Sequence, residues 1–127
     1  MLFCFDVDGT LLTNKMDNEG QYVKGIIPTI ILDRLQQQGH HVVIVSPSPF
    51  RPDGFKVFDR NGSNDYRWEN IKDAMEYYGY SGWCYGSVVY IDDLHGNLDI
   101  VSKNLNIRTM TPIMFMDRIG NQLTLNY

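Results

Sequence analysis

The chain has 127 residues, of which 43% are hydrophobic and 20% are charged, so it can form one domain around one hydrophobic core. Fifteen acidic residues against 11 Lys and Arg give a formal net charge of −4, which argues against broad, nonspecific nucleic-acid binding. No stretch approaches the ~18 apolar residues of a membrane span, and the apolar start lacks the features of a signal peptide, so we expect a cytoplasmic protein.

The first ten residues, MLFCFDVDGT, join a short apolar run to two acids, a glycine and a threonine. The run is too short for a helix and predicts a buried strand that carries Asp6 and Asp8 at its carboxyl end. Ligands of open α/β sheets bind beyond this end of the strands. Two acids in a small volume repel each other unless a cation lies between them or one holds a proton. The pair therefore predicts a divalent metal site with a spare acid for chemistry, or, alternatively, only a turn signal.

A strand, a helix and a second strand follow one another in the first third of the chain. Residues 11–24 are polar and predict a loop or a small hairpin flap. Residues 28–39 predict a helix, with a proline in the first turn and a glycine just past the end. Residues 42–46, VVIVS, predict a buried strand. A βαβ unit makes the two strands parallel and adjacent, so Ser46 is expected at the edge of Asp6.

The second half of the chain continues this alternation. Residues 47–66 contain three prolines and two glycines and predict irregular structure, whereas residues 68–79 predict a helix. Residues 87–93, SVVYIDD, predict a third buried strand that ends in paired acids. A turn and a short helix over 94–105 and a fourth strand over 106–110 follow.

The tail is predicted less sharply. A hairpin around residues 120–121, between strands over 113–118 and 122–126, competes with a helix over residues 114–119. The whole pattern predicts a three-layer α/β sandwich with a mainly parallel, Rossmann-like sheet, formed by a single domain over residues 1–127.

Three of the predicted strand ends resemble motifs of the haloacid-dehalogenase-like (HAD) hydrolases. FDVDGTLL resembles the first motif of that family, DxDGT followed by apolar residues. VVIVS resembles the second motif, an apolar strand that ends in Ser or Thr, and VVYIDD resembles the fourth, which ends in paired acids.

The resemblance implies roles for these residues. Asp6 would be the nucleophile and Asp8 the general acid/base, while Ser46 would bind the phosphoryl group. Mg²⁺ would be held by Asp6, Asp93 and the backbone carbonyl of Asp8, with Asp92 as a further ligand or acting through water. Oxygen-only ligands favour Mg²⁺ over Zn²⁺. For Ser46 alone, a simple turn cap is the competing interpretation.

The third motif of the family, a lysine that pairs with the nucleophile and the phosphoryl group, has three candidates. Lys72 lies 21 residues before Asp93, near the usual spacing, and is the expected phosphate-binding cation. Arg67 and Lys56 are the alternatives, and a solvent-facing helix position is the competing interpretation of Lys72.

These parts predict a Mg²⁺-dependent phosphatase that acts on phosphomonoesters through an aspartyl-phosphate on Asp6. A phosphotransferase and a non-catalytic phosphate-binding module are the alternatives. The gaps at 11–24 and 47–66 are too short for a domain-sized cap. An open site implies a large phosphorylated substrate, such as a phosphoprotein, a nucleotide or a nucleic-acid end, or a homo-oligomer that supplies a lid.

Overall fold

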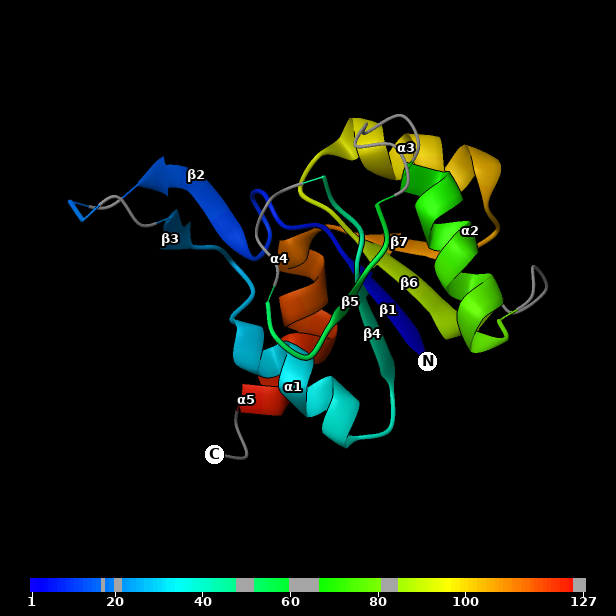
Figure 1. Cartoon of the computed structure of the whole chain (residues 1–127), viewed down its shortest axis with the longest axis horizontal. Coiled ribbons are helices and arrows are strands. Elements are labelled where there is room, and N and C mark those ends of the chain that lie inside the picture. Colours follow the sequence, from blue (N-terminus) through cyan, green and yellow to red (C-terminus); the bar gives the residue numbers. More distant parts are fainter. Residues whose placement is uncertain (17, 20–21, 48–51, 60–66, 81–84, 125–127) are drawn as a thin grey trace.

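A five-stranded, all-parallel sheet forms the centre of the computed structural model, which describes residues 1–16, 18–19, 22–47, 52–59, 67–80 and 85–124 (Figure 1). The strand order is β5-β4-β1-β6-β7, and each neighbouring pair is parallel. The predicted central position of the Asp6 strand is confirmed. The strands are β1 (Leu2–Phe5), β4 (His41–Ile44), β5 (Lys56–Val57), β6 (Val88–Ile91) and β7 (Arg108–Met110).

The register of the three central strands brings their carboxyl ends level. Phe5 of β1 pairs with Ile44 of β4 on one side and with Ile91 of β6 on the other. The pairing continues past the strands, since the Asp6 backbone N–H donates to the Ile91 carbonyl at 3.0 Å. The residues that follow these strands therefore meet at one edge of the sheet, as the βαβ pattern predicts.

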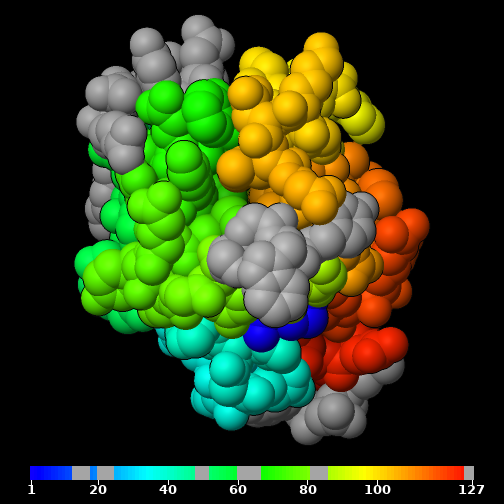
Figure 2. All heavy atoms as spheres, turned by 90° about the vertical axis from the view of Figure 1, so that its right-hand side faces the viewer, coloured from blue at the N-terminus to red at the C-terminus, as the bar shows by residue number. Residues whose placement is uncertain are grey.

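Helices cover both faces of the sheet and complete the three layers (Figure 1). Alternate residues of β1 point to opposite faces, so Phe3 and Phe5 join a core beneath α1 and the C-terminal helices, while Leu2 and Cys4 join a second core beneath α2 and α3. Figure 2 shows α2, in green, and α3, in yellow and orange, side by side. The helical elements are α1 (Thr29–Gln37), α2 (Arg67–Tyr78), the 3₁₀ turn η2 (Tyr85–Ser87), α3 (His95–Asn104), α4 (Pro112–Phe115), the π-helical turn η3 (Met116–Gly120) and α5 (Asn121–Thr124).

The predicted flap is a pair of antiparallel strands, β2 (Leu12–Met16) and β3 (Tyr22–Lys24), which extends away from the main sheet (Figure 1). It joins β1 to α1 and stands on the side of the strands' carboxyl ends. The connection holds no domain-sized insertion. Within the described residues, no helix combines the length and apolar character needed to cross a membrane.

Two sequence expectations differ from the structure. The segment 47–66, predicted to be irregular, contributes the short parallel strand β5, and its residues 48–51 and 60–66 lie outside the described part of the chain. Of the two alternatives for the tail, the hairpin is wrong and the helix over residues 114–119 is confirmed, because residues 112–124 are helical. Thr111 caps α4 by accepting a hydrogen bond from the Met114 backbone N–H at 3.2 Å, and Pro112 occupies the first turn. This Thr-Pro pair is a helix-start signal, and it overrides the turn propensity of Gly120-Asn121.

The C-terminal helices are anchored to the sheet by Phe115. Its ring is fully buried and meets the rings of Phe3 and Phe5 edge-on, at centroid distances of 6.1 and 5.3 Å. Phe115→Ala is expected to lower the free energy of unfolding by about 3–5 kcal/mol, because it leaves a cavity between helix and sheet. Ile113→Ala, in the same helix and 62% exposed, should change it by less than about 0.5 kcal/mol. Urea denaturation of both variants measures the difference, and equal effects would contradict this account of the tail.

Candidate active site

Three carboxylates converge where β1 and β6 end. Asp6 directly follows β1 and is 2% exposed, and Asp92 and Asp93 directly follow β6. One carboxylate oxygen from each of the three lies within 4.8 Å of the others. Hard divalent cations prefer such clusters of carboxylate oxygens, so the donor set suits Mg²⁺.

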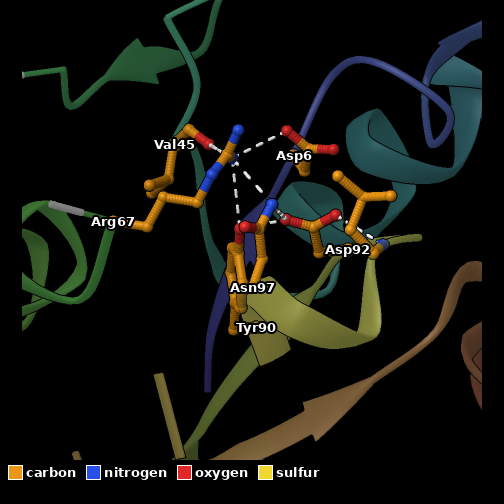
Figure 3. Close-up of polar contacts among 7 residues, drawn as sticks. Asp6, Val45, Arg67, Tyr90, Asp92 and Asn97 are labelled. Carbon is orange, nitrogen blue, oxygen red and sulfur yellow. Dashed lines mark hydrogen bonds and ion pairs between the residues drawn. The ribbon is translucent and has the colours of Figure 1, made fainter. Parts of the chain in front are cut away.

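A buried arginine faces this cluster. Arg67, the first residue of α2, places its Nη1 atom 2.7 Å from Asp6 Oδ1 and 2.8 Å from the Val45 carbonyl oxygen (Figure 3). The same nitrogen lies 3.1 Å from the Tyr90 hydroxyl and 3.7 Å from Asp92 Oδ2. Arg67 therefore supplies positive charge to the nucleophile candidate and to one of the paired acids.

The paired acids differ in what their oxygens contact. Asp92 Oδ1 accepts from the Leu94 backbone N–H at 2.9 Å, and Oδ2 accepts from the Tyr90 hydroxyl at 2.5 Å and from Asn97 Nδ2 at 2.9 Å (Figure 3). Asp93 Oδ1, by contrast, is buried without a hydrogen-bond partner among the described residues. A buried carboxylate oxygen without a donor is costly, and a cation would satisfy it. Asp93 therefore fits a direct metal ligand better than Asp92 does.

Burial, together with the neighbouring charges, shifts the pKa values at the site. Burial raises the pKa of Asp6 to about 8, with a further rise from Asp92 and an opposing contribution from Arg67. Burial, followed by the hydrogen bond and the charge of Asp92, also raises the pKa of Asp93. Burial lowers the pKa of Arg67, but Tyr90, Asp6 and Asp92 outweigh this effect and leave it raised, so the guanidinium stays charged. One arginine does not balance three acids, and a divalent cation would.

The turn after β1 brings the backbone against Asp93. Gly9 has a φ of +77°, and a Cβ built on it would lie 2.1 Å from Asp93 Oδ2. Any side chain at this position would displace the carboxylate, and the left-handed backbone would itself be strained. The glycine of the DGT sequence is thus needed for the close approach of two strand ends.

The two remaining residues expected at the site, Ser46 and Asp8, differ in their exposure to solvent. Ser46 is buried two residues beyond the end of β4, the strand that pairs with β1. Asp8 is exposed, its backbone pairs with that of Leu12, and its carboxylate is not one of the three clustered acids. Its backbone carbonyl, rather than its side chain, was the expected metal donor, and that role remains a prediction.

Neither lysine candidate contacts the acids within the described residues. Lys72 is exposed on α2 and lines a cavity of about 140 Å³ together with Glu69, Asp73 and Glu76. Lys56 is exposed, with its Nζ 4.6 Å from the centroid of the Tyr77 ring. Of the three cations considered from the sequence, Arg67 is the one that the structure places on Asp6.

Two further polar residues lie at the site: the sequence patterns gave Tyr90 no role, and marked Asn97 only as a position where the resembled family often has an acid or polar residue. The strand pattern VVYIDD indicates an aromatic core residue at Tyr90, and the segment that follows indicates a polar helix residue at Asn97. The available signal for Tyr90 was its hydroxyl, since a phenol in a buried strand needs a polar partner.

Comparison with known proteins places this geometry in a known fold. No family model matches the sequence, and no curated protein matches it. A solved structure assigned to the HAD hydrolase family, from Streptomyces avermitilis, superposes with a TM-score of 0.59 and 16% identity over 86% of this chain and 69% of that chain. A structure assigned as a 3-deoxy-D-manno-octulosonate 8-phosphate phosphatase, from Vibrio cholerae, gives 0.53 and 15% over 86% and 73%.

The chain has the HAD fold. The sequence resemblance and the superposed structures agree on it, although identities of 15% and 16% carry the fold alone. Within that fold, the acids at the ends of β1 and β6 occupy neighbouring strands, as the resemblance implies.

Gly9→Ala tests the close approach of the DGT turn to Asp93. We expect Mg²⁺ affinity to fall by about 10-fold or more, as when the support of a metal ligand is disturbed. Gly79→Ala is the matched control, because its φ of +81° imposes the same backbone strain while no heavy atom lies within 4 Å of the added Cβ. Calorimetric titration with Mg²⁺ measures both variants. Equal affinities would show that Gly9 does not shape the site.

The raised pKa of Asp6 predicts how the stability of the metal-free protein depends on pH. An unfolded Asp has a pKa near ~3.9, so between about pH 4 and about pH 8 the folded protein binds more protons than the unfolded chain. The free energy of unfolding should therefore fall as the pH rises through this range. Asp6→Asn should flatten the fall, and Asp33→Asn, at an exposed position of α1, should not. Urea midpoints measured in EDTA decide the matter, and a rise of stability towards pH 8 that depends on Asp6 would contradict it.

Proposed function

We propose that this protein is a Mg²⁺-dependent phosphomonoesterase in which Asp6 is the nucleophile. The observation that carries the proposal is the contact of the buried Asp6 carboxylate with Arg67, 2.7 Å away, beside the acids of β6 at the carboxyl edge of the sheet. A carboxylate, a fixed cation and a cluster of oxygen donors are the parts that phosphoryl transfer through a covalent intermediate requires.

The reaction would proceed in two steps. The Asp6 carboxylate attacks phosphorus, the bond from phosphorus to the leaving oxygen breaks, and Asp8 gives its proton to that oxygen. Asp8 then takes a proton from a water molecule, whose oxygen attacks the aspartyl-phosphate and releases inorganic phosphate with Asp6 restored. The exposure of Asp8 suits a group that serves both the leaving oxygen and water. Asp6 and Asp93 are the side chains that would hold Mg²⁺, whose charge would offset the repulsion between Asp6 and the phosphoryl group.

Arg67 takes the role for which Lys72 was expected. Its guanidinium contacts Asp6 and can donate to phosphoryl oxygens, on which charge accumulates in the transition state. Ser46, buried at the end of the adjacent strand, is the proposed second donor to the phosphoryl group. Both act from elements next to β1, so the phosphoryl group would bind between β4, β1 and the start of α2.

The open edge of the sheet determines how a substrate would reach the site. The described connection between β1 and α1 holds only the β2–β3 pair, so a phosphorylated substrate would reach Asp6 without a domain-sized cap closing over it. A phosphotransferase would use the same first step and differ in the acceptor of the second.

Asp6→Asn is the direct test of the proposal. A panel of phosphomonoesters (mononucleotides, sugar phosphates, phosphopeptides and 3′-phosphorylated oligonucleotides) is assayed for phosphate release with Mg²⁺ and with EDTA. Wild-type turnover should require Mg²⁺, and the variant should lose it while keeping its circular dichroism spectrum, because an amide does not attack phosphorus. Substantial turnover by the purified variant would exclude Asp6 as the nucleophile. Release of phosphate only when an alcohol acceptor is added would identify a phosphotransferase.

Arg67→Ala and Lys72→Ala separate the two candidate cations. Loss of Arg67 should lower kcat by about 10²–10³-fold, the usual cost of removing one charged transition-state contact. Arg67→Lys, which keeps a charge beside the acids, should retain the fold and part of the rate. Lys72→Ala should stay near wild type, because Lys72 is exposed. A crippled Lys72 variant beside a normal Arg67 variant would return the role to Lys72.

A further inference from the structure

Tyr90 combines a core position with two polar contacts that both lead to the site. Its side chain is fully buried in β6, in the apolar layer beneath α2 and α3. Its hydroxyl accepts from Arg67 Nη1 at 3.1 Å and donates to Asp92 Oδ2 at 2.5 Å. A phenol in an apolar core is costly unless its hydroxyl is paired. Packing alone would be served as well by Phe, so the hydroxyl is what the site uses.

Asp92 extends this contact into a chain of hydrogen bonds. Its oxygens receive donors from Tyr90, from Asn97 on α3 and from the Leu94 backbone. The Asp92 carboxylate is therefore held by donors of its own chain on both oxygens, whereas Asp93 Oδ1 has no hydrogen-bond partner in the part of the chain that the structure describes. The contacts run from Asn97 through Asp92 and Tyr90 to Arg67, and from there to Asp6 (Figure 3).

The arrangement fixes the arginine from several directions. Nη1 carries two hydrogens, and its shortest contacts are to Asp6 Oδ1 at 2.7 Å and the Val45 carbonyl at 2.8 Å. The Tyr90 hydroxyl oxygen, on β6, accepts a hydrogen bond from the same nitrogen at 3.1 Å. A long side chain loses rotamer entropy when it is held in one conformation, so fixing it before the substrate binds removes that cost from the transition state.

We propose that Tyr90, held by Asp92 and Asn97, is a positioning residue that sets where the Arg67 guanidinium meets Asp6 and the phosphoryl group. The proposal rests on the function proposed above. It also assigns Asp92 to the support of Arg67, which leaves the metal to Asp6 and Asp93. Tyr90 touches neither the substrate nor the metal in this assignment and acts through Arg67.

Tyr90→Phe tests the proposal, because it removes the hydroxyl and keeps the ring. Tyr80→Phe is the matched control, since the Tyr80 hydroxyl contacts His41 Nδ1 at 3.1 Å outside the site. Three quantities are measured for each variant: kcat and KM with the best phosphomonoester, the Mg²⁺ dissociation constant by calorimetry, and the Nη resonances of Arg67 by ¹⁵N NMR.

We expect Tyr90→Phe to lower kcat by about 10–100-fold, the range typical of groups that support a reacting residue. Its Mg²⁺ affinity should equal that of wild type, because Asp6 and Asp93 are unchanged. The Arg67 Nη resonances should show faster rotation and exchange, while Tyr80→Phe should match wild type in all three measurements. A merely structural role for Tyr90 would lower stability without moving kcat or the Arg67 resonances.

Each outcome decides a separate question. Unchanged Arg67 resonances in Tyr90→Phe, or an unchanged kcat in an active enzyme, would overturn the proposal. A wild-type protein without Mg²⁺-dependent turnover would overturn the proposed function, and the Arg67 resonances would then decide the positioning role alone. If Tyr90→Phe fails to fold, the pair Asp92→Asn with Tyr90→Phe removes the stranded charge, and the same resonances are read in that protein.

Discussion

The contact between Arg67 and Asp6 is the interaction on which the rest of the site depends. The sheet brings Asp6, Asp92 and Asp93 together because parallel strands end at the same edge, and buried like charges repel each other. Burying an ion pair costs desolvation that its attraction often fails to recover. Apolar residues between α2 and β1 would pack without this desolvation cost, so the buried pair lowers the stability that this region could otherwise have.

The arrangement of the strands could be predicted without any side-chain detail. An alternation of strands and helices with right-handed crossovers leaves few topologies, and in these Asp6, Ser46 and Asp93 share one edge. Asp6, Asp92 and Asp93 could also be recognised from the sequence, because each follows an apolar run that predicts a strand. The helical start at Thr111-Pro112 was also present in the sequence, but the glycine and asparagine at 120–121 suggested a turn instead. The cap at Thr111 and the packing of Phe115 between sheet and helices both favour the helix.

The identity of the cation could not be predicted by counting residues. Arg67 and Lys72 are five positions apart on α2, which separates them by about 140° around the helix. Only one of the two can face the sheet edge, and the structure places Arg67 there, whereas the sequence spacing to Asp93 favoured Lys72. A role for Tyr90 could not be predicted because an aromatic residue in an apolar strand is typical of a hydrophobic core. Its hydroxyl finds Arg67 as a partner only when α2 packs beside β6. The two-residue strand β5 is too short for any periodicity to show.

The sequence distances spanned by Arg67 have a consequence for folding. Its contacts reach 61 residues back to Asp6, 22 back to Val45 and 23 forward to Tyr90. Contacts of such separation close large loops, and they form only after β1, β4, β6 and α2 have met. Because the contact to Tyr90 needs β6, a nascent chain acquires the complete set only once β6 has been synthesised. The Asp6 carboxylate therefore meets the Arg67 guanidinium late in folding, and partly folded forms of the chain would lack this ion pair.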